Sequence, residues 1–77
     1  MNLPFAGEWT VSVQAARTFS IHGDLYYEIQ AVRTDGPTAG PMVLRMPQHA
    51  AVRPPAAGDT LRLTFLMGQV TSAKHVE

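Results

Sequence analysis

The clearest alternation of apolar and polar positions lies in the last third of the chain. Every second residue from 61 to 65 is apolar and the residues between are polar, which predicts a strand with one buried face. A Gly-Asp pair precedes this run, and Met67-Gly68 follows it as a tight turn into a second strand. The pattern therefore predicts a β-hairpin. In its second strand, residues 69–76, the apolar positions are three apart, so we expect a bulge there.

Two earlier segments, 8–17 and 25–34, show the same alternation and are predicted to be strands. Between them, a Gly-Asp turn is expected at residues 23–24. The pattern leaves two possibilities for Phe19 and Ile21, which either extend the first strand past a bulge or pack as a loop. One face of the first strand is predicted to carry Trp9, Val11, Val13 and Ala15.

Prolines and glycines divide the middle of the chain. Residues 35–41 contain two glycines and two prolines, which cannot sustain a ladder, and they are predicted to form a loop. Residues 42–46 form a short third strand whose two methionines are expected to fill the core. For residues 47–55, a short helix over 48–52 that begins after a proline and an extended crossing both fit the sequence.

The order of elements is strand, strand, strand, short helical connection, strand, strand, which predicts an all-β antiparallel protein. This order and the closing Gly-Asp, strand, Gly, strand segment resemble the OB-fold, a five-stranded Greek-key small barrel. An SH3-like barrel is the alternative, since it also packs five short strands into this length. We expect residues 1–77 to form a single small β-barrel domain. Both barrels would bury Trp9, Val11, Val13, Tyr27, Ile29, Leu44, Leu61, Leu63, Phe65 and Val70.

Size and charge limit the classes of function. A chain of 77 residues with 45% hydrophobic content fits one domain whose core is close to the lower limit for independent folding. The absence of cysteine excludes disulfides and thiolate metal sites. Six basic residues balance six acidic ones, which disfavours non-specific binding to duplex phosphates but permits a local basic face. The first residues lack a basic and apolar leader, and no apolar run approaches about 20 residues, so we expect a cytoplasmic protein without a membrane partner.

The OB-fold resemblance implies a binding face on the second and third strands and on the loop at residues 17–24. OB-folds that bind single strands stack bases on aromatic side chains and hold the backbone with basic ones. The sequence therefore predicts a non-enzymatic module for single-stranded nucleic acid, with an ordinary solvated surface as the competing interpretation. The predicted nucleic-acid-binding residues are Arg17, Phe19, Tyr26, Arg33 and Arg45.

An alternative function is a protein-interaction or assembly domain that forms a homodimer through an edge strand. The third and fifth strands are short or terminal and could offer such an edge, and Met67 in its turn could add an exposed apolar contact.

No catalytic, metal or cofactor site is predicted. Ser20, His22 and Asp24 alternate along the chain, but neighbouring positions on an open strand provide neither a pocket nor an oxyanion hole. The pairs His22-x-Asp24 and His75-x-Glu77 each offer two ligands, whereas a metal site needs three or four that converge.

Overall fold

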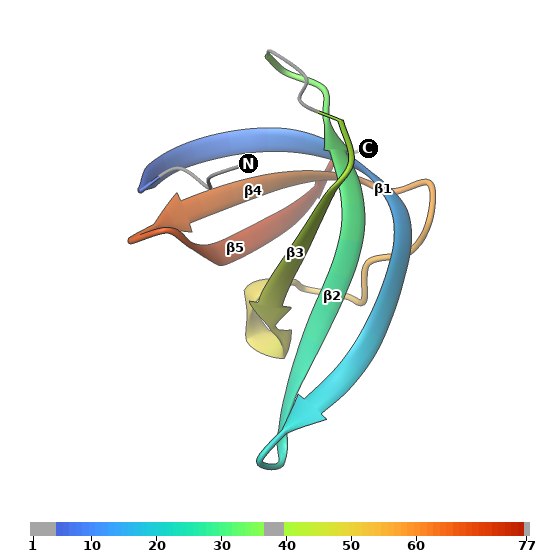
Figure 1. Cartoon of the computed structure of the whole chain (residues 1–77), viewed down its shortest axis with the longest axis vertical. Helices are drawn as coiled ribbons and strands as arrows, with labels where there is room; N and C mark the ends of the chain where they lie inside the picture. The colour runs from blue at the N-terminus through green and yellow to red at the C-terminus, as the bar shows by residue number, and fades with distance from the viewer. Residues whose placement is uncertain (1–4, 37–39, 77) are drawn as a thin grey trace.

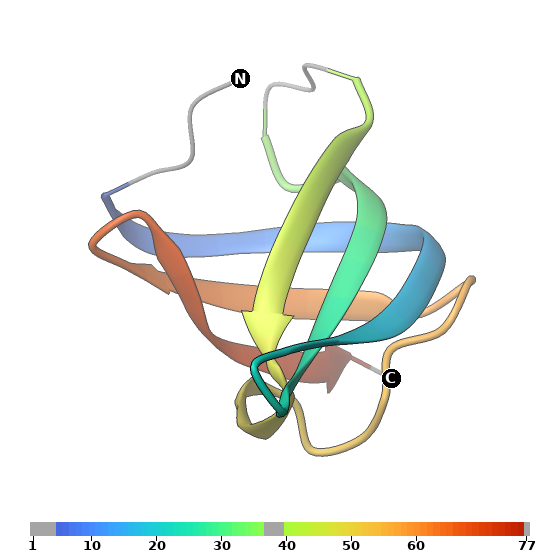
Figure 2. The same ribbon diagram turned by 60° about the horizontal axis from the view of Figure 1, so that its bottom comes forward.

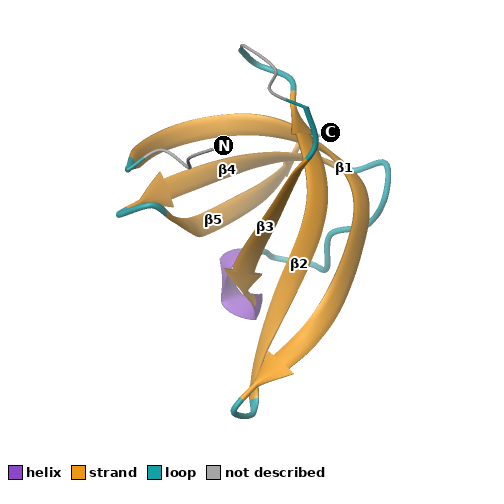
Figure 3. Cartoon of the chain, viewed as in Figure 1, coloured by secondary structure: helices purple, strands orange, loops and turns teal. Residues whose placement is uncertain are grey.

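The computed structural model describes residues 5–36 and 40–76, and the chain in these ranges is all-β and antiparallel, as predicted. Part of the predicted loop at 35–41 and the ends of the predicted 1–77 domain lie outside the described residues. The elements in chain order are β1 (Ala6–Ile21), β2 (Asp24–Arg33), β3 (Met42–Pro47), the 3-10 turn η1 (Gln48–Ala50), β4 (Thr60–Leu66) and β5 (Gln69–Val76) (Figures 1 and 3).

All five strands belong to one curled sheet with the order β3-β2-β1-β4-β5 (Figure 2). β1 is the central strand, because its first half pairs with β4 and its second half pairs with β2. The curl brings β3 and β5, the two edges, into contact. In the described part of the chain no ladder joins these edges, so the sheet remains open.

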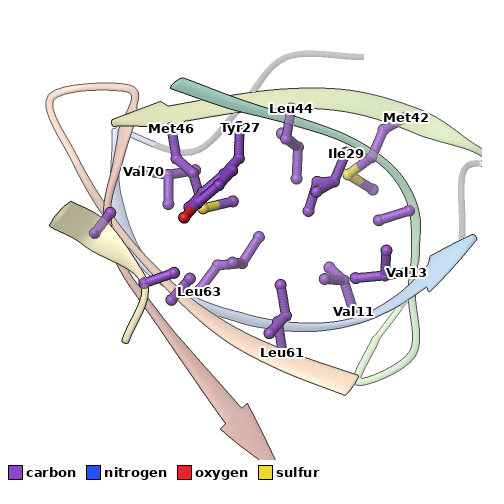
Figure 4. Packing of buried hydrophobic residues seen from close by; sticks show 14 of the residues in the cluster. Val11, Val13, Tyr27, Ile29, Met42, Leu44, Met46, Leu61, Leu63 and Val70 are labelled. Atoms are coloured by element: carbon purple, nitrogen blue, oxygen red, sulfur yellow. The ribbon is translucent and has the colours of Figure 1, made fainter. Parts of the chain in front are cut away.

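The core lies inside the curl, where side chains from β1, β2, β3, β4 and β5 point toward one another (Figure 4). Nine of the ten predicted core residues are buried. The tenth, Trp9, is partly buried and packs edge-on against Phe65, with ring centroids 5.2 Å apart. Met42 and Met46 are also buried, which confirms the prediction that they fill the core.

β1 is longer than predicted, because the strand contains a bulge and continues beyond residue 17. The β1–β2 register passes from Val13 directly to Ala15, which shifts the alternation by one residue. At this point β1 exchanges backbone hydrogen bonds with the segment before β4, since Val13 N donates to Asp59 O and Gly58 N donates to Val13 O. The bulge places Ala15 on the exposed face, so the prediction that it shares a face with Val11 and Val13 was wrong.

Two hairpin turns use left-handed backbone at adjacent residues. The predicted Met67-Gly68 turn is confirmed, with φ of 55° and 76°. The β1–β2 turn consists of His22 and Gly23, with φ of 51° and 87°, and not of the predicted pair at 23–24. Positive φ at both central residues is the geometry that matches the twist of paired strands.

The structure also decides between the alternatives that the sequence left open for residues 69–76 and 47–55. β5 contains the expected bulge, because its register to β4 skips Thr71. The helix considered over 48–52 is limited to the three residues of η1, and Ala51 then forms a parallel bridge with Ala73 of β5. No helix in the described ranges has the length and apolar character needed to cross a bilayer.

Candidate functional site

The second half of β1 and the first half of β2 form a hairpin that pairs with β3 and whose tip extends past the end of β3 (Figure 1). Residues two apart on a strand share a face, and the register of β1, β2 and β3 aligns two rows on the outer face of this hairpin. The first row is Arg17, Glu28 and Arg45, and the second is Phe19, Tyr26 and Pro47. We call Arg17, Phe19, Tyr26, Glu28 and Arg45 the arm face.

Two aromatic rings occupy the middle of the arm face. Phe19 and Tyr26 are opposite each other in the ladder, and their rings are stacked with centroids 5.7 Å apart and planes 24° from parallel. Both residues are half-buried, so the pair leaves part of its apolar surface in contact with solvent. Aromatic side chains of this kind are the platforms on which unpaired bases stack.

Two guanidinium groups lie beside this aromatic pair. The Cζ atoms of Arg17 and Arg45 are 5.3 Å and 5.4 Å from the Phe19 ring centroid, within cation–π range. Both arginines donate from Nε to Glu28, which lies between them on β2, at 2.8 Å to Oε1 and 2.9 Å to Oε2. Two cations and one anion give the arm face one net positive charge.

The ion pairs change the acid–base behaviour of these groups. The hydrogen bond from Arg17, followed by that from Arg45, holds the pKa of Glu28 below its usual value, against the smaller opposing effect of burial. The same hydrogen bond to Glu28 raises the pKa of Arg17. The Glu28 carboxylate and the Arg17 guanidinium are therefore charged at neutral pH.

A cleft of about 650 Å³ adjoins the arm face and runs over the edge of β3. Exposed Ile21 and Val43 extend the apolar surface of Phe19 and Tyr26 along it, and the turn before β5 forms its far wall. The remaining lining residues are Leu44, Arg45, Met46, Pro47, Gly68, Gln69 and Val70.

Four of the five residues predicted to bind nucleic acid lie together on the arm face, and Arg33 does not. The Arg33 guanidinium lies over the Trp9 ring, 4.5 Å from its centroid, and its Nε donates to Asp35 Oδ1 at 2.8 Å. A Cβ at Gly36 would be 2.9 Å from this guanidinium, so the loop after β2 packs closely on it. Arg33 therefore covers one end of the core instead of joining the arm face.

Sequence reasoning missed Glu28 as the acceptor for both arginines. The available signal was its position two residues after Tyr26, which places the two side chains on one face of β2. The strand registers decide which cations lie opposite Glu28. The bulge sets the register of β1, and the chain between β2 and β3 sets that of β3.

The groups considered for catalysis or metal binding lie in two places, the exposed tip of the β1–β2 hairpin and β5. Ser20 is in β1, His22 is in the turn and Asp24 begins β2, and all three are exposed. Within the described residues, no three His, Asp or Glu side chains gather as metal ligands. His75 instead lies in β5, where its Nε2 is 3.2 Å from Asp59 Oδ2, and Glu77 of the second considered pair lies outside the described residues.

Comparison with known proteins adds no identity to this geometry. Neither a protein-family profile, nor a curated protein, nor a solved structure matches the chain.

Proposed function

We propose that this protein is a non-enzymatic module that binds single-stranded nucleic acid through the arm face. An unpaired base stacks on the Phe19–Tyr26 pair, and the guanidinium groups of Arg17 and Arg45 contact the phosphates beside it. The observation that carries this proposal is the convergence of two stacked rings and two cations, from three strands, on one partly exposed face.

The magnitudes support binding of moderate strength. Base–aromatic stacking contributes about 1–3 kcal/mol per base. A charge-assisted hydrogen bond contributes about 1.5–3 kcal/mol. One or two stacked bases and two phosphate contacts approach the roughly 8 kcal/mol of a micromolar complex.

Three features favour a single strand over a duplex. The rings need unpaired bases, which a duplex does not expose. The arm face carries one net positive charge, and the whole chain carries none, so few duplex phosphates would be neutralised. The adjoining cleft gives an extended ligand a path over the β3 edge.

The finer fold assignment is part of the same proposal. The sheet order β3-β2-β1-β4-β5, with η1 between β3 and β4, is the order of an OB-fold in which β3 and β5 meet. We therefore assign an OB-like small barrel in preference to an SH3-like one. The arm face lies on the strands that such barrels use for oligonucleotides.

The test is a titration of a fluorescent oligothymidine, followed by anisotropy at low and at physiological salt. Tyr26→Ala is expected to weaken binding by about 5-fold to 100-fold, since it removes half of the stacking pair. Arg17→Gln is expected to reduce the dependence of log K on log salt by about 0.7, the value for one phosphate contact on a single strand.

Two control variants, matched in residue type, test whether a loss of binding is specific to the arm face. Phe5→Ala removes an aromatic side chain that is 73% exposed elsewhere, and Arg62→Gln removes a cation that pairs with Glu8. Both are expected to bind as the wild type does. Absence of wild-type binding at low salt, or equal losses in Phe5→Ala and Phe19→Ala, would contradict the proposal.

The open edges of the sheet favour a second candidate function, assembly through β3. Val43 is 59% exposed on this edge strand, and unpaired edges are templates for strand pairing. Light scattering would then give twice the monomer mass of 8.4 kDa, and Val43→Lys would return the mass to that of a monomer. A monomer at all concentrations would exclude this candidate.

A further inference from the structure

Glu28 differs from the two arginines of the arm face because its side chain is much less exposed to solvent. Its side chain is 15% exposed, whereas those of Arg17 and Arg45 are 61% and 63% exposed. It lies between the two arginines in the ladder and accepts the Nε–H of each on a separate oxygen.

This arrangement leaves the outer ends of both guanidinium groups available. Each arginine uses Nε for Glu28, and no other described residue, in 5–36 or 40–76, accepts from its two Nη groups. A guanidinium carries five N–H donors in a rigid fork, so four donors per arginine remain for a phosphate.

We infer that Glu28 is the positioning residue of the arm face: it orders Arg17 and Arg45 beside the aromatic pair before a phosphate arrives. This inference rests on the proposed function. Glu28, the single acidic member of the arm face, thus favours the binding of an anionic ligand, although its negative charge alone would oppose that binding.

Two effects of Glu28 oppose each other and depend differently on salt. At low salt, repulsion between its charge and a phosphate about 6 Å away lowers the affinity for the ligand about threefold. At physiological salt the affinity falls less than twofold. Ordering a long side chain on binding costs a factor of about two to ten, and Glu28 removes this cost for two arginines. Each ion pair is a direct hydrogen bond to a side chain that is 15% exposed, so salt weakens it less than it weakens the repulsion across about 6 Å. The ordering effect therefore exceeds the repulsion once salt is present.

The experiment compares Glu28→Gln with Glu8→Gln in the oligothymidine titration. Both changes remove one negative charge. Glu28→Gln weakens the contacts to Arg17 and Arg45, whereas Glu8→Gln weakens a single contact, to Arg62 away from the arm face. At about 0.3 M salt, where the Debye length is near 6 Å, Glu28→Gln is expected to bind three- to tenfold more weakly than the wild type. Glu8→Gln is expected to bind as the wild type does.

A second measurement uses the protein without ligand. The Nε–Hε signals of Arg17 and Arg45 are expected to show restricted motion in the wild type and increased motion in Glu28→Gln. This readout would not change if Glu28 served only to repel anions.

The outcomes distinguish the two proposals. Wild-type binding together with equal or tighter binding by Glu28→Gln at about 0.3 M salt would overturn the inference and leave the proposed function intact. Unchanged arginine motion in Glu28→Gln would also overturn it. Absence of wild-type binding at every salt concentration would overturn the proposed function itself, and with it this role of Glu28.

Discussion

Replacing Met67 with asparagine is expected to stabilise the protein. Met67 has a φ of 55°, where the Cβ of an ordinary L-residue costs about 1–2 kcal/mol, and asparagine tolerates this region better. The Met67 side chain is 71% exposed, so little buried apolar area is lost. Gly68 follows with a φ of 76°, which makes Asn-Gly the preferred pair for this turn. We expect a gain of about 0.5–1 kcal/mol in the free energy of unfolding, or about 2–8 °C in Tm.

Thermal unfolding followed by circular dichroism, with urea unfolding at 25 °C as a second measure, would test this expectation. His22→Asn is the matched control, because His22 occupies the same place in the other turn with a φ of 51°. Histidine is already enriched in left-handed backbone, so the gain there should be smaller. The urea midpoint should rise without a change in the m-value.

A Tm for Met67→Asn at or below that of the wild type would refute the reasoning. Such a result would mean that contacts of the exposed Met67 side chain stabilise the protein by more than its left-handed backbone conformation destabilises it. A gain in His22→Asn larger than in Met67→Asn would also refute it, since the order of residue preferences would then be reversed.

Three further perturbations are expected to affect the core, the loop after β2 and the arm face. Phe65→Ala, at a fully buried position, should cost about 3–5 kcal/mol and leave a domain of this size largely unfolded, as measured by circular dichroism; a folded variant would contradict this. Gly36→Ala should push the Arg33 guanidinium off Trp9 at a cost below about 1 kcal/mol, and an unshifted tryptophan emission spectrum would contradict it. Because the folded pKa of Glu28 is lowered, its stabilising effect is complete above its unfolded pKa of about 4.3 and is lost as pH falls through the folded value. Urea unfolding from pH 6 to pH 3 should therefore show a smaller fall in stability for Glu28→Gln, and equal falls would argue against the ion pairs.

Most of the core could be predicted from the sequence because burial in a strand follows a period of two. The alternation within 25–34 and 61–65 survives unchanged in β2 and β4, and the predicted faces are the observed ones. The bulge after Val13 could not be located in the same way. It is held by hydrogen bonds to Gly58 and Asp59, which lie more than forty positions along the chain. Local patterning carries no information on such a contact.

The arm face could likewise be predicted only in part, because some of its residues are placed by local alternation and others by distant parts of the chain. Tyr26 could be assigned to an outward face, because Tyr27 next to it is a core residue. Arg33 could have been separated from the arm face by parity alone, since it shares the odd positions of Tyr27 and Ile29. The grouping of Phe19 with Tyr26, by contrast, depends on the length of β1 beyond the bulge, which the alternation within 8–17 left open.

The division of β1 between two partners also sets an order of events in time. Its second half pairs with β2 across a two-residue turn, whereas Glu8 in its first half pairs with Thr64, over fifty positions away. Hairpins close in about 1–10 μs, and pairings between distant segments are much slower. Arg17, Phe19, Tyr26 and Glu28 all belong to the fast half. We therefore expect the aromatic pair to assemble early, during synthesis of the chain, and Arg45 and the core to be added afterwards.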